Sequence, residues 1–256
     1  MFHNVKTKWH SGFAGWAWNN RMKRKIKVLV DILMLLLLFA VMSYHKTGEQ
    51  AHKCLGIGIF LLFILHNVLN WTWFKNLLQG KYTAIRAVHT AMNVLLILDM
   101  IALAVSGFLL SSLALRLQIH AGLFSRKLHM LSAAWGYVLI AAHMGLHWGM
   151  VTGKWKGAGK RIFPVWVSRL LALLVVVYGL YAAATRQFYL KMFWMVDYAF
   201  YDYEEPVIWF AFDYICVLIG FAYISRCTIQ LLKKHKGVKT CCKLPGDLFS
   251  TISKII

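Results

Sequence analysis

The sequence predicts an all-α integral membrane protein with six transmembrane helices, from three observations. Of its 256 residues, 60% are hydrophobic and only 15% are charged, whereas ordinary soluble domains carry roughly 25% charged residues. The apolar residues come in long uninterrupted runs, and a bilayer core of about 30 Å needs about 20 such residues in a helix. The formal net charge of +20 comes mostly from lysines and arginines between these runs, so it favours a lipid bilayer over nucleic acid as the partner.

Six stretches are long and apolar enough to be spans: residues 26–44, 52–74, 88–113, 128–151, 165–187 and 206–232. The aromatic and acidic connection between the last two, residues 188–205, is predicted to form a short helix at the membrane surface. The spans divide the chain into four predicted segments: a lead-in over 1–22, a four-helix bundle over 23–151, two further spans with an acidic aromatic outer loop over 152–232, and a basic tail over 233–256. No signal peptide is expected.

Lysine and arginine residues concentrate on one side of the six predicted spans. That side takes Lys23, Arg24, Lys25, Lys27, Lys75, Lys81, Arg86, Lys154, Lys156, Lys160, Arg161, Lys233, Lys234, Lys236 and Lys239. The other side has only Lys46, Arg116, Arg126, Lys127, Arg186 and Lys191. Because short loops rich in Lys and Arg stay in the cytoplasm, both termini are predicted to be cytoplasmic.

Two of the predicted spans each carry two histidines fourteen residues apart, His52 with His66 and His129 with His143. Both spans run from outside to inside, so His52 and His129 lie near the outer surface and the other two lie about 21 Å deeper. Fourteen residues make four turns of a supercoiled helix, which places each pair on one face. Facing imidazoles are what a six-coordinate haem iron requires. The pattern predicts two haem b groups, His52–His129 and His66–His143, bound without covalent attachment because no CxxCH is present.

Glycines close to these histidines would leave room for a porphyrin edge. Gly56 and Gly58 follow His52, and Gly136 lies midway between the two histidines of its span. Small residues also serve ordinary helix packing in membranes, and a lone histidine in a span is more often a hydrogen-bonding group than a ligand. His89 and His147 lie on the same side as the inner pair and are alternate ligands for the inner haem.

The histidine pattern resembles the membrane diheme cytochromes b, whose two haems stack across the bilayer. Three sequence motifs are more similar to an uncharacterised bacterial family of cytochrome-b-like integral membrane proteins, a domain of unknown function. The motifs are His-x3-Gly-x9-His-x3-Asn-Trp-x-Trp from His52, SGFLLS at 106–111, and LHM…HMGLHW within 128–148. The resemblance covers about residues 24–150. It implies a four-helix haem-binding bundle in the bacterial inner membrane, an electron-transfer role, and His52, His66, His129 and His143 as ligands.

Asp99 lies near the middle of the third predicted span, where ionisable groups are costly and usually functional. It is a candidate for a proton path or for binding a quinone hydroxyl. A carboxyl that is held protonated and bonded to a neighbouring helix is the structural alternative.

These observations predict an electron-transfer subunit of an oxidoreductase, with no catalytic residue of its own. It would be a diheme b-type cytochrome moving electrons across the membrane between a quinol pool and a redox partner protein. One alternative is the membrane subunit of a ferric- or flavin-linked reductase, and another is a membrane protein with incidental histidines. A histidine-lined metal transporter would be expected to have helices broken near the midplane, but the three prolines, Pro164, Pro206 and Pro245, lie at span starts and in the tail.

Overall fold

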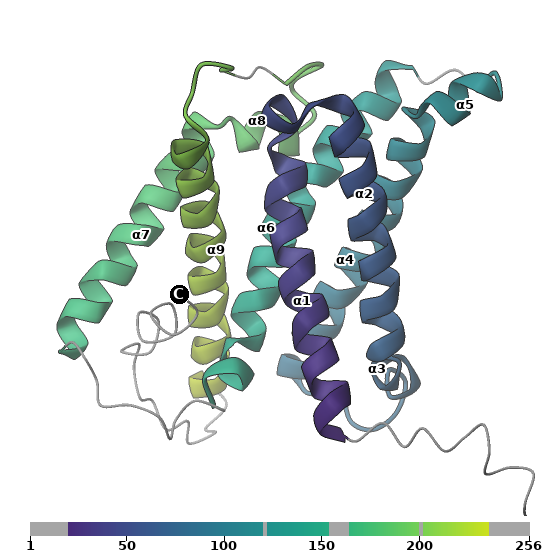
Figure 1. Cartoon of the computed structure of the whole chain (residues 1–256). Helices are drawn as coiled ribbons and strands as arrows, with labels where there is room; N and C mark the ends of the chain where they lie inside the picture. Colours follow the sequence, from purple (N-terminus) through teal and green to yellow (C-terminus); the bar gives the residue numbers. More distant parts are fainter. Residues whose placement is uncertain (1–19, 120–121, 154–163, 200–201, 236–256) are drawn as a thin grey trace, which may run out of the picture.

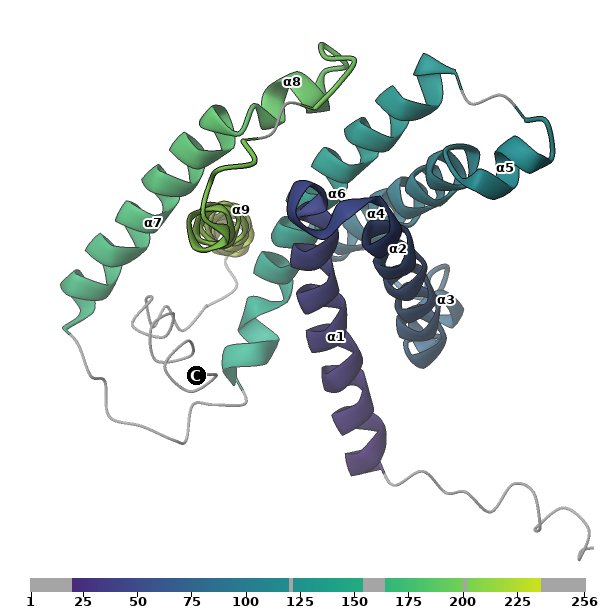
Figure 2. The same ribbon diagram turned by 45° about the horizontal axis from the view of Figure 1, so that its top comes forward.

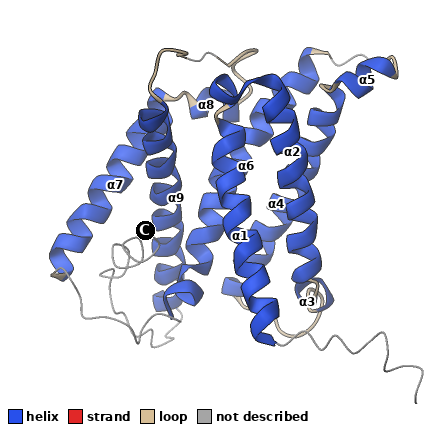
Figure 3. Ribbon diagram, in the orientation of Figure 1, coloured by secondary structure: helices blue, strands red, loops and turns tan. Residues whose placement is uncertain are grey.

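The computed structural model describes residues 20–119, 122–153, 164–199 and 202–235, and within these ranges it is helical with no strand (Figure 3). The helices are α1 Asn20–Met42, α2 Tyr44–Leu69, α3 Thr72–Lys75, α4 Ala84–Leu109, α5 Ser112–Arg116, α6 Leu123–Gly153, α7 Val165–Thr185, α8 Phe188–Met192 and α9 Val207–His235. The all-α prediction is confirmed for this part of the chain. The predictions for residues 1–19, for the basic cluster 154–161 and for the tail from residue 236 lie outside the described residues.

Four of the described helices are long and apolar enough to cross a membrane: Tyr44–Leu69, Ala84–Leu109, Trp166–Thr185 and Val207–Leu232. The other two long helices, α1 with 23 residues and α6 with 31, run beside them (Figure 1). Both are more polar, because α1 carries Lys27 and Asp31 and α6 carries three histidines. The apolar character of four helices supports a multi-pass membrane protein.

The long helix α6 lies between two groups of helices. It packs extensively against α4 and against α9, while α9 also packs against α7 and α1 packs against α2. Seen from above, α7 and α9 lie on one side of α6, and α1, α2 and α4 lie on the other (Figure 2). Helix α2 packs extensively on α1 alone and has no comparable contact with α4 or α6. The seam between α2 and the α4–α6 pair is therefore loosely packed.

The second predicted span, 52–74, differs from the structure at both ends. Helix α2 already begins at Tyr44, with a break at Gly48, whose φ of 80° is a conformation that favours glycine. It ends at Leu69, where the carbonyl of His66 accepts from both the backbone amide (3.0 Å) and the side chain (2.9 Å) of Asn70. The last predicted residues of the span form the separate short helix α3.

Two glycines allow the close packing of α9 on its neighbours. A Cβ placed on Gly145 of α6 would lie 2.0 Å from the Ala222 carbonyl oxygen, and one on Gly179 of α7 would lie 2.4 Å from that of Cys216. Glycine therefore lets the backbones approach, as is common between helices in membranes. The buried Tyr137 of α6 adds a polar link, since its hydroxyl donates to the Tyr214 carbonyl of α9 (2.6 Å).

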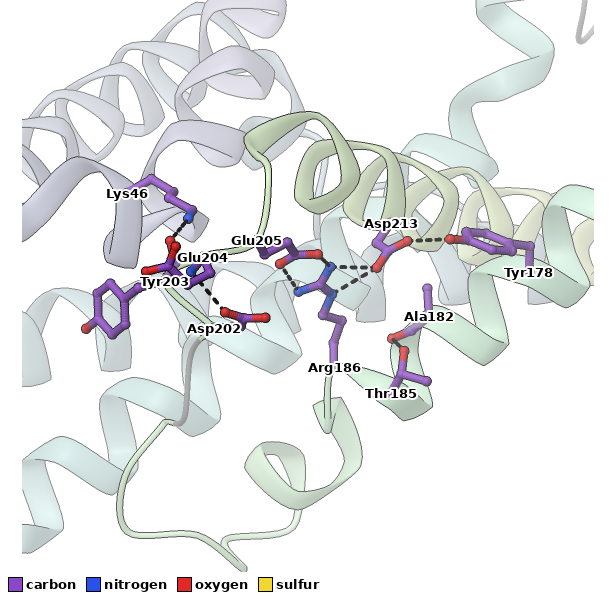
Figure 4. A network of polar contacts seen from close by, with 10 residues as sticks. All are labelled: Lys46, Tyr178, Ala182, Thr185, Arg186, Asp202, Tyr203, Glu204, Glu205 and Asp213. Carbon is purple, nitrogen blue, oxygen red and sulfur yellow. Dashed lines mark hydrogen bonds and ion pairs between the residues drawn. The ribbon is translucent and has the colours of Figure 1, made fainter.

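An ion-pair network joins α7, the outer connection and α9 (Figure 4). Arg186, at the end of α7, donates to both carboxylate oxygens of Glu205 and, through Nε, to Oδ2 of Asp213 (2.9 Å). Tyr178 donates to the other oxygen of Asp213 (2.6 Å). These bonds raise the pKa of the Arg186 guanidinium above its ordinary value, and those to Glu205 contribute most. The short helix α8 lies in the same connection, where a short helix is predicted.

Replacing Arg186 with Ala should destabilise the protein, because it leaves two carboxylates that are only 16% and 14% exposed without their partner. The expected loss is about 3 kcal/mol, measured as a lower midpoint of thermal unfolding in detergent. Lys53→Ala is the matched control, since it breaks an exposed pair with Glu49 on α2 and should cost under about 0.5 kcal/mol. Equal midpoints for the two variants would show that the network contributes little.

Candidate functional site

The outer histidines, His52 on α2 and His129 on α6, face each other across the loosely packed seam. Their ring centroids are 6.1 Å apart and the ring planes are inclined by 73°. Two imidazoles that bind one metal from opposite sides, at about 2 Å each, have ring centres about 6 Å apart. The structure therefore brings together the two residues that the sequence pairs at the outer level, at a separation that suits one metal between them.

Hydrogen bonds to neighbouring helices fix the tautomer of both outer histidines. Nδ1 of His52 lies 3.0 Å from the Val41 carbonyl oxygen of α1, which can only accept. Nδ1 of His129 lies 3.2 Å from the hydroxyl oxygen of Ser106 on α4, and that hydroxyl donates to the Leu103 carbonyl (3.0 Å). Both Nδ1 atoms therefore carry the proton, and both Nε2 atoms keep a lone pair. Such outer bonds are typical of histidines that bind metals.

Glycines lie beside both outer histidines. Gly107 of α4 lies directly against His129, since a Cβ there would reach its ring at 3.5 Å. Gly56 lies one turn after His52 on the same face, and a Cβ there would meet nothing within 4 Å. Space is therefore open beside Gly56, whereas a Cβ on Gly58 would meet the Leu37 side chain of α1 at 3.7 Å. Four helices, α1, α2, α4 and α6, together build the outer site.

Four histidines form the inner cluster: His66 of α2, His89 of α4, and His143 and His147 of α6. The ring contacts join His147 to His89, with centroids 5.3 Å apart, and to His143, with centroids 4.4 Å apart. His66, His89 and His147 all lie within electrostatic range of His143. The predicted inner pair, His66 and His143, thus shares one cluster with both alternates, and ring contact links the alternates directly.

Hydrogen bonds orient the inner histidines as well. Nδ1 of His66 donates to the Asp31 carboxylate of α1 (2.8 Å), and Nδ1 of His89 donates to the Ile85 carbonyl (2.8 Å). Each therefore keeps its Nε2 lone pair, although the Asn70 amide nitrogen lies 3.4 Å from that of His66.

His143 differs from the other inner histidines through Asn93 of α4. With the Asn93 amide oriented so that its oxygen accepts from Trp73 Nε1 (3.1 Å), its nitrogen lies 3.1 Å from Nδ1 of His143. That orientation leaves the His143 proton on Nε2. If His143 binds a metal through Nε2, the Asn93 amide must turn over.

The sequence suggests that Gly136 leaves room for a porphyrin edge. In the structure, the Asp99 carboxyl lies in this space instead. A Cβ on Gly136 would lie 2.4 Å from Asp99 Oδ2, so the carboxyl of α4 lies directly on the glycine of α6. Oδ2 is buried and has no hydrogen-bond partner within the described residues. This oxygen therefore does not form the bond to a neighbouring helix that the structural alternative requires.

A cavity of about 780 Å³ opens beside the inner cluster, between α3 and α4. It is lined by Thr72, Trp73, Asn76, Leu77, Gln79, Gly80, Arg86, His89 and Thr90. Arg86 donates to the Asn76 carbonyl (2.5 Å) and lies over the Tyr82 ring, which fixes one wall. Because His89 belongs both to the cavity and to the cluster, a molecule bound here lies next to the inner histidines.

Several groups that orient the histidines are not visible in the histidine spacing. The sequence identifies Ser106 only as part of the SGFLLS motif, and no sequence pattern points to the Val41 carbonyl. A polar residue in an apolar run, seven positions from Asp99, is the one signal that points to Ser106. Among the described residues no group of three or more His, Cys, Asp or Glu is placed to hold a metal ion by itself.

Comparisons with protein-family models, with curated proteins and with solved structures gave no match to this chain. The resemblance to cytochrome-b-like proteins therefore stays a prediction from the quoted residues. The functional conclusion depends on the geometry of the two histidine groups.

Ser106→Ala should increase the fraction of His129 that carries its proton on Nε2, because it removes the hydroxyl that accepts from Nδ1. The loss of one hydrogen bond of about 1 kcal/mol changes the ratio of the two tautomers by about fivefold. Nitrogen NMR of histidine-labelled protein measures that ratio directly. Ser111→Ala is the control, since Ser111 caps α5 and accepts from the Ala114 amide. A tautomer ratio unchanged in Ser106→Ala would contradict the assigned hydrogen bond.

Proposed function

We propose that this chain is a membrane diheme b-type cytochrome that carries electrons across the bacterial inner membrane. The observation that supports it most is the outer pair, in which His52 and His129 face each other at 6.1 Å with both Nδ1 atoms bonded outward. Two imidazoles are too few to hold an ion alone. They suit a metal that brings its other ligands with it, as a porphyrin does.

The packing around the outer pair fits a flat group. Helix α2 lacks extensive contact with α4 and α6, and the space beside Gly56 is open. When bound, haem would supply one-electron transfer at its iron. The protein supplies the two Nε2 lone pairs, and the bonds to Val41 and Ser106 keep both rings in the binding tautomer.

The inner cluster would hold the second haem. We assign it to His66 and His143, which repeat the spacing of the outer pair, with His89 and His147 as alternates. The Asp31 carboxylate accepts from Nδ1 of His66 and so fixes the orientation of this ring and leaves its lone pair on Nε2. The two levels are about 21 Å apart along a helix, which is most of the roughly 30 Å hydrocarbon thickness.

The same function requires α1 and α6 to span the membrane with the four apolar helices. Both run beside those helices over their length (Figure 1). Polar residues of both helices bond to partners on neighbouring helices, as Asp31 does with His66 and His129 with Ser106, and polar groups in spans usually pair in this way. With six spans, the lysine and arginine distribution supports cytoplasmic positions for both termini.

The cavity beside His89 is where a quinol head group would exchange electrons with the inner haem. Its lining offers hydrogen-bond donors at Asn76 and Gln79 together with apolar walls, a combination common in small-molecule sites. A redox partner protein would meet the outer haem on the other side of the membrane.

The first test is cofactor content. We expect about two haems b per chain and low-spin spectra in both redox states, from haem quantitation and a reduced-minus-oxidised spectrum. His52→Ala and His129→Ala should each lose the outer component, and His66→Ala and His143→Ala the inner one. His45→Gln is the histidine control and should keep both. A colourless protein made with haem supplied would refute the proposal, and metal analysis would then test a transporter.

Transmembrane electron transfer is the second test. In liposomes with an oxidant trapped inside and the cytoplasmic side inward, an impermeant external donor should reduce that oxidant through the protein. The two haems lie in series, so His52→Ala or His66→Ala should reduce the rate to that of empty liposomes. If His52→Ala transferred electrons at the original rate, the outer site would not lie on the path.

A further inference from the structure

Asp99 lies midway between the two histidine groups. On α4 it is seven residues from Ser106, which bonds His129, and six from Asn93, which contacts His143. On α6 it meets Gly136, which is seven residues from each of those histidines. Seven residues are about two helical turns, or about 10 Å. The carboxyl is therefore about equally far from both proposed haems.

Among the described residues, no cation forms an ion pair with Asp99. Its Oδ2 atom is buried and has no hydrogen-bond partner within the described residues. Helix α6 presents Gly136 to it, and the nearest titratable groups on that helix are His129 and His143, two turns away in either direction. Among the described residues of α5, α6 and α9, which contact α4, none forms a hydrogen bond or an ion pair with this Oδ2 atom.

We infer that Asp99 binds a proton when the two histidine sites are reduced and releases it when they are oxidised. This inference depends on the proposed function. With ferric iron, each site carries net positive charge, which stabilises a carboxylate over about 10 Å because the surroundings screen poorly. Reduction removes that charge and leaves a carboxylate with one buried oxygen that has no hydrogen-bond partner, which is unfavourable. The electron comes from the quinol or an added reductant, and a proton from water joins the carboxylate oxygen.

The geometry makes this role specific to Asp99. Asp31 is bonded to His66 and its side chain is 54% exposed, and Asp213 is neutralised by Arg186. Asp99 alone among these acids is both unpaired at one oxygen and placed between the two levels. It acts as a charge-compensating group for both sites together.

The test measures proton uptake on reduction of the purified, haem-loaded protein in weakly buffered detergent solution with a pH-indicator dye. Asp99→Asn, which keeps the shape of the side chain, should take up about one proton per chain fewer than the unmodified protein on full reduction. Asp197→Asn is the control, since Asp197 pairs with Lys127 outside the spans, and it should match the unmodified protein. Haem propionates contribute equally to all three.

Infrared difference spectra give a second readout that does not require Asp99→Asn to bind haem. Reduction of the unmodified protein should produce the carbonyl stretch of a protonated carboxyl, which shifts in heavy water. Gly136→Ala should keep this band at a changed frequency, because its Cβ must displace the Asp99 carboxyl.

The outcomes separate the two proposals. A protein that binds no haem refutes the proposed function. A haem-loaded protein in which Asp99→Asn takes up as many protons as the unmodified chain refutes this inference alone. If Asp99→Asn loses haem, the inference is refuted when the unmodified protein lacks the carbonyl band, or when Gly136→Ala leaves that band unmoved.

Discussion

The hydrogen bonds from histidine Nδ1 atoms to neighbouring helices are the interactions on which the site depends. The N–H group of a buried imidazole needs a hydrogen-bond acceptor. That of His52 donates to an acceptor on α1, and that of His129 donates to one on α4. Each bond joins two helices and at the same time decides which nitrogen keeps a lone pair. Helix packing and ligand chemistry are therefore determined by the same contacts, and a change in one alters the other.

The all-helical architecture and the rough position of every long helix follow from the apolar runs, because length and hydropathy are local properties of the sequence. The pairing of His52 with His129 also follows, since a fourteen-residue repeat on two parallel helices leaves few other arrangements. The end of α2 at Leu69 does not, because the apolar run continues through Trp71, Trp73 and Phe74 although the helix stops before them.

The inner level could be predicted only in part, for a reason of geometry. At that level four histidines from three helices come together, and spacing alone does not distinguish a ligand from a neighbour one turn away. Gly136 is a similar case, because a small residue signals a close approach without identifying the group that approaches. The structure identifies this group as Asp99, which comes from a helix that the glycine pattern does not involve.

The loose seam between α2 and the α4–α6 pair has a consequence for the life of the protein in the cell. A ligand that binds only the folded state stabilises it in proportion to the logarithm of its free concentration. With little direct packing across this seam, the cohesion of the bundle would depend on what the histidines hold between them. Cofactor insertion would then be a late step of assembly. Under the proposed function, chains made when haem is scarce would lack this cohesion along α2 and would be degraded faster than haem-loaded chains.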